Sequence, residues 1–183
     1  MIEYKTAENS IELQQIIELQ AINLPSNISD EELKQQGFVT VKHDLDLLTR
    51  MNSPYGHIIA KDGDKIAGYA LVMLKDFADE VPVLFTMFER INLLQHKGEK
   101  LGNTQYFVMG QVCVAKDYRS QGVFAGLYQH MKKCMSPHFD YIVTQISSRN
   151  TRSKRAHEKV GFETIKTYKD DHDDWEIVLW DWG

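Results

Sequence analysis

Cysteine and proline are scarce in this chain of 183 residues, which holds two cysteines and four prolines. Cys113 and Cys134 are too few to build a disulfide framework, so the sequence excludes a small secreted fold held together by disulfides. Long apolar runs are also missing, because the longest, residues 66–74, is far shorter than the roughly 20 residues that span a bilayer. The first residues, Met-Ile-Glu-Tyr-Lys-Thr, lack the basic and then apolar order of a signal peptide. We therefore expect a reduced, cytoplasmic protein with no membrane partner.

Positive charge is in deficit over the whole chain, whose net charge is −5, and this argues against nucleic acid as the partner. The charges are unevenly distributed, because residues 116–169 hold 11 Lys and Arg against 4 Asp and Glu. Residues 170–183 hold six acidic residues and no Lys or Arg. A basic segment within an acidic protein suits a polyanionic cofactor and a cationic acceptor, although an ordinary solvated surface would give the same pattern.

The composition, 43% apolar and 26% charged, is typical of a globular protein, and the length suits one domain over residues 1–183. The fold class predicted is α+β, with a mixed, mainly antiparallel twisted sheet flanked by helices. Strands are expected over residues 2–5, 55–61, 65–74, 104–114, 139–146, 162–168 and 175–182. Helices are expected from Asn9 or Ser10 to before Pro25, and over 27–36, 43–51, 81–94, 122–135 and 150–160.

Residues 75–103 form a long insertion between the third and fourth expected strands. A helix over 81–94 would place Leu84, Phe88, Ile91 and Leu94 on one side, with a glycine-containing loop after it over 97–103. An insertion of this kind could serve as a substrate lid or as the surface of a homodimer, and its sequence does not choose between them.

The most informative stretch is residues 112–128. A short apolar run, Val112 to Val114, predicts a buried strand that passes through a polar turn into a helix, and Gly122 lies where the turn meets the helix. The free N–H groups and positive dipole end of a helix start form a natural phosphate site, and glycine lets a ligand approach the backbone.

Two motifs carry a family resemblance. Arg119-x-x-Gly122 resembles the pyrophosphate-binding segment Gln/Arg-x-x-Gly-x-Gly/Ala of the GNAT acetyltransferase superfamily, with Phe124 in place of the last small residue. Further along, Asn150, Ser153, His157 and the pair Gly161-Phe162 match the spacing of the later family segment Asn-x-x-Ala-x-x-x-Tyr-x-x-x-Gly-Phe. The two motifs stand in the family's order, with one expected strand between them.

The resemblance implies a set of residues that bind acetyl-coenzyme A as the acyl donor. Pyrophosphate would rest on the amides of Gln121, Gly122, Val123, Phe124 and Ala125, with Arg119 and Ser120 close to the phosphates. The pantetheine arm would pair, like an added strand, with the backbone of Val112, Cys113 and Val114. Asn150, together with Ser153 in the same motif, would contact the arm, although Asn150 is equally suited to cap the helix that follows it.

His157 is the catalytic candidate, because the family often has a tyrosine here that protonates the departing thiolate. Imidazole is a weaker standing acid than phenol at neutral pH, and a packing or surface role is the alternative. The general base is not assigned, with Glu89, His43 and His172 as possibilities. No metal is expected, since Asp170 to Asp174 fit a solvated turn, and Cys113 fits a small buried hydrophobe better than an acyl-carrying nucleophile.

The function expected is transfer of an acetyl or other acyl group from acetyl-coenzyme A to a primary amine of a small molecule, by direct attack in a ternary complex. Two alternatives stay open: a protein lysine or N-terminus as the acceptor, and a coenzyme A-binding module with weak or lost catalysis.

Overall fold

The computed structural model describes residues 1–27, 39, 41–80, 82–171 and 173–183. Seven strands form one sheet: β1 (Glu3–Thr6), β2 (Ile58–Asp62), β3 (Lys65–Met73), β6 (Tyr106–Val114), β7 (Tyr141–Ser147), β8 (Glu163–Lys169) and β9 (Asp174–Asp181). The helices are α1 (Ser10–Ile22), α3 (Leu45–Met51), α4 (Pro82–Leu93), α5 (Val123–Met135) and α6 (Thr151–Val160). Short 3-10 turns cover Pro25–Asn27, Lys75–Glu80, Leu101–Asn103 and Lys116–Tyr118, and a small hairpin joins β4 (Gln95–His96) to β5 (Glu99–Lys100).

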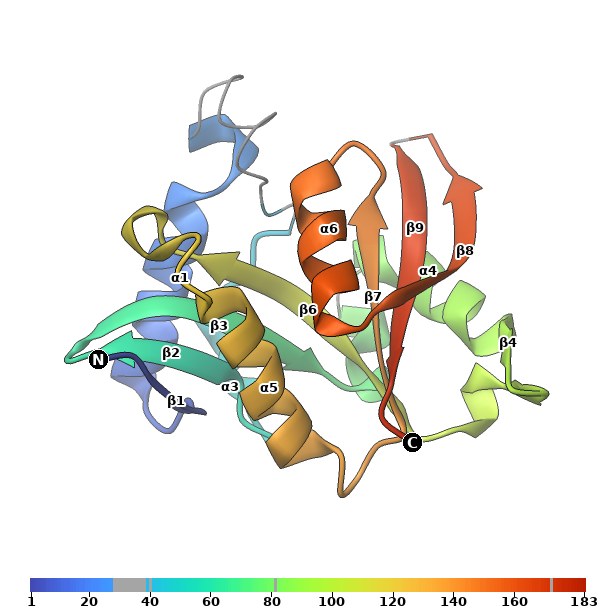
Figure 1. Ribbon diagram of the computed structural model, residues 1–183, viewed down its shortest axis with the longest axis horizontal. Helices are drawn as coiled ribbons and strands as arrows, with labels where there is room; N and C mark the ends of the chain where they lie inside the picture. The colour runs from blue at the N-terminus through green and yellow to red at the C-terminus, as the bar shows by residue number, and fades with distance from the viewer. Residues whose placement is uncertain (28–38, 40, 81, 172) are drawn as a thin grey trace.

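The strand order is β1-β2-β3-β6-β7-β9-β8. Within the described part of the chain, β6 and β7 form the one parallel pair, and the other neighbouring strands of this sheet run antiparallel. The parallel pair is possible because α5 carries the chain from the end of β6 back to the start of β7. Helices α5 and α6 lie in front of the sheet in Figure 1, while α1 and α4 lie behind it. The expected mixed α+β fold is confirmed.

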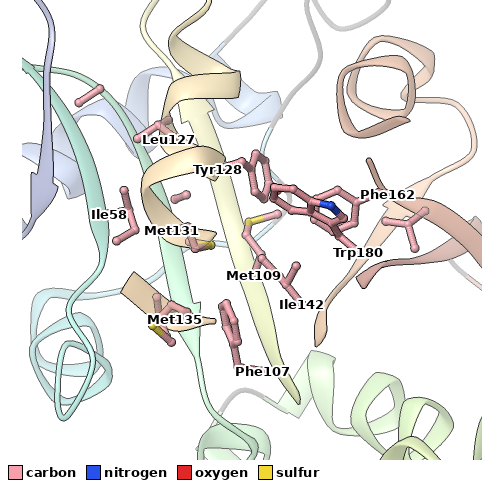
Figure 2. Close-up of a cluster of buried hydrophobic side chains, with 14 of the residues drawn as sticks. Ile58, Phe107, Met109, Leu127, Tyr128, Met131, Met135, Ile142, Phe162 and Trp180 are labelled. Carbon is pink, nitrogen blue, oxygen red and sulfur yellow. The ribbon is translucent and has the colours of Figure 1, made fainter. Parts of the chain in front are cut away.

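The core is divided between the two faces of the sheet. On the α5 and α6 face, Figure 2 shows Leu127, Tyr128 and Met131 of α5 turned toward Phe107 and Met109 of β6. Two further clusters lie on the opposite face, one against α4 and the other against α1. These buried rows follow from the sequence, because side chains of β6 alternate between the faces and α5 has apolar residues three and four apart.

The expected order of elements is confirmed wherever the chain is described. Asn9 caps α1, its side chain accepting a hydrogen bond from the Glu12 amide, as the sequence predicted. The helix predicted over 27–36 lies outside the described residues, apart from Asn27.

The insertion over residues 75–103 is folded against the sheet. Helix α4 forms where a helix was expected, and Met87, Phe88 and Ile91 are buried beside Leu101. The placement of the Leu84 side chain lies outside the description. A loose lid would not bury so many apolar side chains, so this insertion is a stable part of one face of the sheet. No helix in the described ranges combines the length and apolarity needed to cross a bilayer.

Candidate functional site

A cleft of about 700 Å³ lies between the N-terminal end of α5 and one side of α6. Its wall is built from four segments and two isolated residues, namely Val112–Val114 of β6, the loop at 118–120, the turn at 122–125, α6 with the Asn150 that precedes it, and Asn23 and Val39. Most of the residues that the sequence assigned to the cofactor are therefore brought together, and Gln121 and His157 are absent from this wall.

The cleft exists because β6 and β7 separate. The two parallel strands pair at Tyr106–Tyr141, Phe107–Ile142 and Val108–Val143, and no pairing continues in the described residues beyond them. The Thr144 hydroxyl donates to the Met109 carbonyl at 2.9 Å, at the point where the strands part. Beyond it, β7 pairs with β9 alone, so the last residues of β6 have an open edge. A bulge in the pairing of β6 with β3, between Ala70 and Val72, falls in the same region.

Alternation along β6 decides which residues use that open edge. The Ala115 amide donates to the Ala67 carbonyl of the facing strand at 2.8 Å, so this residue pair is hydrogen bonded. In an antiparallel ladder the backbone groups of the next residue point the other way, so the N–H and C=O of Val114 and Val112 face the opening. This orientation is the one that the β-augmentation hypothesis needs.

The start of α5 has the predicted phosphate-binding geometry. Gly122 is its N-cap residue, with φ +81° and no capping side chain, and a Cβ built on it would meet open space. Ser120, two residues earlier, also has a positive φ of 62°. Because the first N–H groups of a helix have no partner within the helix, those of this turn face the cleft beside the positive end of the dipole.

Arg119 has a role that its sequence position did not predict. Its guanidinium donates to the Val114 carbonyl at 3.0 Å and to the Asn23 side-chain oxygen at 2.7 Å. The arginine thus ties the end of β6 to the end of α1, although it also lines the cleft. A phosphate contact by Arg119 stays a prediction.

Helix α6 presents its polar residues to the cleft. The side chain of Asn150 accepts from the Ser153 amide at 3.2 Å, which confirms the N-cap, and its amide nitrogen is left for other contacts. Arg152, Arg155 and Lys159 also line the cleft, three to four residues apart on one face of the helix. The sequence pointed to a basic α6 and could not say which cations face the cofactor.

His157 is on α6 but is 1% exposed. Its Nδ1–H donates to the Ser153 carbonyl at 2.8 Å, and its Nε2 lies 2.6 Å from the Tyr128 hydroxyl. Burial lowers the pKa of His157 to about 4, so the ring is neutral at neutral pH. A buried, neutral imidazole with both nitrogens engaged is poorly placed to protonate a thiolate.

Phe124 stands between the cleft and this histidine. It lines the cleft, and its ring packs edge-on against His157 at 5.0 Å and, in a tilted arrangement, against Tyr128 at 5.1 Å between centroids. The Phe124 ring, which replaces the last small residue of the family motif, thus touches α6 while it also lines the cleft. Nothing local in the sequence shows that Tyr128 pairs with a residue 29 positions away.

The remaining candidates are dispersed. Cys113 is buried and burial raises its thiol pKa to about 12, which suits a packing role. Glu89 is on the exposed side of α4, and His172 lies outside the described residues. His43 is buried with its pKa lowered by burial to about 4, and its Nδ1 accepts from Gln20. In the described ranges no group of three His, Cys, Asp or Glu is arranged to hold a metal ion.

The acidic turn between β8 and β9 is bound to α6 and to the loop before it. Asp173 accepts from Arg149 at 2.8 Å and from the Ser147 hydroxyl at 2.6 Å, and Glu176 pairs with Lys154 at 2.9 Å. These contacts neutralise part of its charge, as does the ion pair of Asp174 with Lys169.

The sequence model of the acetyltransferase (GNAT) family matches residues 14–162. A search of curated proteins found no significant match. Among solved structures, the ribosomal-protein-S18-alanine N-acetyltransferase from Escherichia coli aligns with a TM-score of 0.66 and 11% identity, covering 99% of this chain and 94% of its own. A GNAT-family acetyltransferase from Streptococcus agalactiae 2603 aligns with a TM-score of 0.66 and 14% identity, and the alignment covers 100% of this chain and 96% of that one. The structure of yncA from Salmonella typhimurium, with its cofactor acetyl-CoA, aligns with a TM-score of 0.63 and 13% identity. The alignment covers 100% of this chain and 94% of that one.

Proposed function

Because the chain belongs to the GNAT acetyltransferase family, we propose that it transfers an acetyl group from acetyl-coenzyme A to a primary amine of a small molecule, by direct attack within a ternary complex. The observation that carries this proposal is the opening between β6 and β7, set beside the uncapped start of α5. A strand edge and a helix N-terminus in that arrangement suit a ligand with an amide-rich arm and a diphosphate.

The start of α5 binds the diphosphate in this scheme. The amides of Gln121–Ala125 donate to its oxygens, and the left-handed Gly122 aims them at the cleft without a side chain in the way. Ser120 adds a hydroxyl, and Arg119 holds the end of β6 in place while adding positive charge near the phosphates.

The end of β6 orients the thioester. The N–H and C=O of Val112 and the N–H of Val114 bond the amides of the pantetheine arm, while the Val114 carbonyl accepts from Arg119. Cys113 between them packs into the opposite core. Asn150 and Ser153 contact the same arm from α6. Orientation of this kind replaces a bimolecular encounter with an intramolecular one, which is a large share of what such a reaction needs.

The cationic face of α6 recognises the remaining negative charge of the donor. Arg155 and Lys159 are exposed and line the cleft, with Arg152 half-buried beside them. Their charge is complementary to that of the phosphorylated nucleotide part of acetyl-coenzyme A.

The hypothesis that His157 protonates the departing thiolate requires a path for the proton from His157 to the cleft. His157 is absent from the cleft wall, and the cleft-lining residues Phe124 and Ser153 both contact it, so a proton would have to pass by way of one of them. Without such a path, water or the acceptor itself supplies the proton, and His157 keeps α6 in place through Tyr128. The base that deprotonates the amine is not assigned to a residue.

A protein N-terminus is the second candidate acceptor. It is favoured by the likeness to the Escherichia coli enzyme, which is named for acetylating an alanine of ribosomal protein S18. The identity is 11%, so the likeness supports the fold more than the acceptor. A coenzyme A-binding module without turnover is the third candidate, because Phe124 and His157 both depart from the family pattern.

Two measurements test the proposal in sequence. Isothermal titration with acetyl-coenzyme A measures binding, and thiol release with a panel of small amines and of short peptides with free N-termini measures transfer. Turnover on small amines supports the proposal, and turnover on the peptides alone replaces it with the second candidate. Binding without any thiol release would indicate the module, and no binding at all would remove every role assigned above.

A further inference from the structure

Among the described residues, one cation without an acidic ion-pair partner lies on the α4 face of the sheet, opposite the start of α5. Arg90 of α4 places its guanidinium carbon 3.9 Å from the ring centroid of Tyr168 on β8. The side chain is half-buried, and no acidic residue in the described ranges forms an ion pair with it. An arginine stacked on one ring face keeps the N–H groups at its edge available for a planar anion.

Two further donors lie in the same layer. The Tyr168 hydroxyl donates to the side-chain oxygen of Gln145 and so fixes the orientation of that amide. The NH₂ group of Gln145 then points away from Tyr168 and is a hydrogen-bond donor. Trp175 is paired directly with Tyr168 across β8 and β9, so both side chains are on one face of the sheet. The indole N–H of Trp175 is buried and has no hydrogen-bond partner.

The layer adjoins the opening in the sheet. Gln145 lies on β7 two residues beyond Val143, the last residue that pairs with β6. The cleft wall includes Asn23 and Val39, which belong to the α1 side, as well as Val114, which packs toward α5. A molecule on the α4 face can therefore approach the same opening as the acyl donor from the other side.

Negative charge is present at the rim of this layer. Asp173 is engaged by Arg149 and Ser147. Asp170 is close enough to contribute to the raised pKa of Tyr168, which burial raises most and Arg90 partly offsets. The donors inside this layer suit the anionic group of a ligand.

We propose that Arg90, Gln145 and Trp175 recognise a carboxylate on the acceptor, so that the acceptor is an amino-acid-like molecule with an amine and a carboxylate. This rests on the proposed function for the identity of the ligand as acceptor. The guanidinium binds the carboxylate along its edge, and the indole N–H and the Gln145 amide donate to the same oxygens.

Matched pairs of amines test this directly. The pairs are L-lysine with cadaverine, L-ornithine with putrescine and L-phenylalanine with 2-phenylethylamine, each pair differing by one carboxylate. Thiol release with saturating acetyl-coenzyme A should give a higher kcat/KM for the carboxylate member. Arg90→Gln should raise KM for that member by about ten- to a hundredfold, as expected when a hydrogen-bonded charge is lost, and leave its decarboxylated partner unchanged.

Further variants separate recognition from packing. Arg90→Lys keeps the charge without the planar fork, so its KM should fall between those of the wild type and Arg90→Gln. Trp175→Phe keeps the ring and removes the N–H, and should raise KM for the carboxylate member alone. Lys65→Gln removes an exposed charge at the β2–β3 turn and serves as the matched control, with no effect on either member.

The outcomes are distinct. Faster turnover of the decarboxylated members, or equal losses for both members in Arg90→Gln, would overturn the inference and leave the proposed function standing. If no amine is turned over, titration of the three amino acids into protein saturated with coenzyme A decides: heat abolished by Arg90→Gln supports the carboxylate site, and no heat refutes it.

Discussion

The hydroxyl of Tyr128 lies 2.6 Å from Nε2 of His157 and joins α5 to α6 in the middle of a buried aromatic cluster. Since Nδ1–H donates to the Ser153 carbonyl, the neutral ring must accept from the tyrosine at Nε2. The tautomer is thus set by the fold. The two helices that bear the two family motifs are thus joined by a hydrogen bond between His157, which belongs to the second motif, and Tyr128, which belongs to neither.

Replacing the histidine tests whether this contact is structural or chemical. We expect His157→Phe to retain kcat to within a few-fold, because the wild-type nitrogens are engaged and shielded by Phe124. Steady-state kinetics on a working amine checks this. A loss of a hundredfold or more in kcat, with an unchanged KM for acetyl-coenzyme A, would restore His157 as the acid.

A double-mutant cycle measures the contact itself. Tyr128→Phe and His157→Phe should each lower the free energy of unfolding by about 1–3 kcal/mol, since each leaves a buried polar group unpaired. The double variant should cost less than the sum of the two, because it leaves neither group behind. Denaturant unfolding at pH 7 supplies the four values, and simple additivity would mean that the hydrogen bond contributes nothing to stability.

Acid should destabilise the protein through its buried histidines. Burial lowers the folded-state pKa of His43, His57 and His157 to about 4, below the ordinary value near 6.5. The unfolded state therefore binds more protons between these values, and stability is complete above pH 6.5 and is lost as the pH falls toward 4. Each histidine accounts for up to about 3 kcal/mol of this loss.

Unfolding free energies at intervals from pH 7.5 to 4.5 measure the slope, and His157→Phe removes one of the three contributions. Its curve should be flatter than that of the wild type over this range. Parallel curves would show that His157 is not protonated on unfolding, and a native-state pKa near 6.5 by NMR would contradict the burial argument.

Phe124 should control access to the same histidine. Phe124→Ala removes the ring that packs against His157, so diethyl pyrocarbonate, which modifies accessible neutral imidazole, should reach Nε2 in the variant far faster than in the wild type. Mass spectrometry of the peptide containing residue 157 gives the two rates. Phe124→Leu, which keeps an apolar cover, is the matched control, and equal rates in all three proteins would mean that Phe124 does not shield the ring.

Local sequence signals predicted much of this structure and some of the site. The apolar run before Gly122 and the helical spacing after it were enough to place β6, the bend and α5, because those features depend on neighbouring residues. Contacts such as Arg119 with Asn23, 96 positions apart, depend on how the helices end in space. A single sequence contains no local signal for them, and so Arg119 was assigned to the phosphates alone.

Orientation across the sheet was the other gap. The predicted strand over 104–114 did not show that its pairing with β7 stops at Val108, and this separation is what opens the cleft. Similarly, the basic run in α6 did not reveal that Arg152, Arg155 and Lys159 share the cleft while Lys154 pairs with Glu176. Helical spacing gives the faces, but only the packing of α6 decides which face meets the ligand.

Gly122 offers a test with an internal reference. Gly122→Ala places a side chain at φ +81° and should cost about 1 kcal/mol in stability, and it should weaken acetyl-coenzyme A binding because the amides of the first turn shift. Gly63→Ala is the matched control: its φ is +61°, its Cβ also meets open space, and it lies in the turn between β2 and β3. The two variants should lose similar stability, with an affinity loss in Gly122→Ala alone.

The cations of α6 that line the cleft should strengthen binding of acetyl-coenzyme A through its phosphate groups. Arg155→Gln and Lys159→Gln remove exposed charges that line the cleft, so each should raise KM for acetyl-coenzyme A several-fold at low salt and less at high salt, where exposed charges are screened. Lys133→Gln on the exposed side of α5 is the control, since it changes the net charge equally and lies outside the cleft wall. Repeating the assay with acetyl-3′-dephospho-coenzyme A separates the contacts, because a residue that binds the 3′-phosphate loses its effect on this donor while one that binds the diphosphate keeps it. An equal rise in KM for all three variants would mean that these cations act only through the net charge of the protein and do not contact the donor.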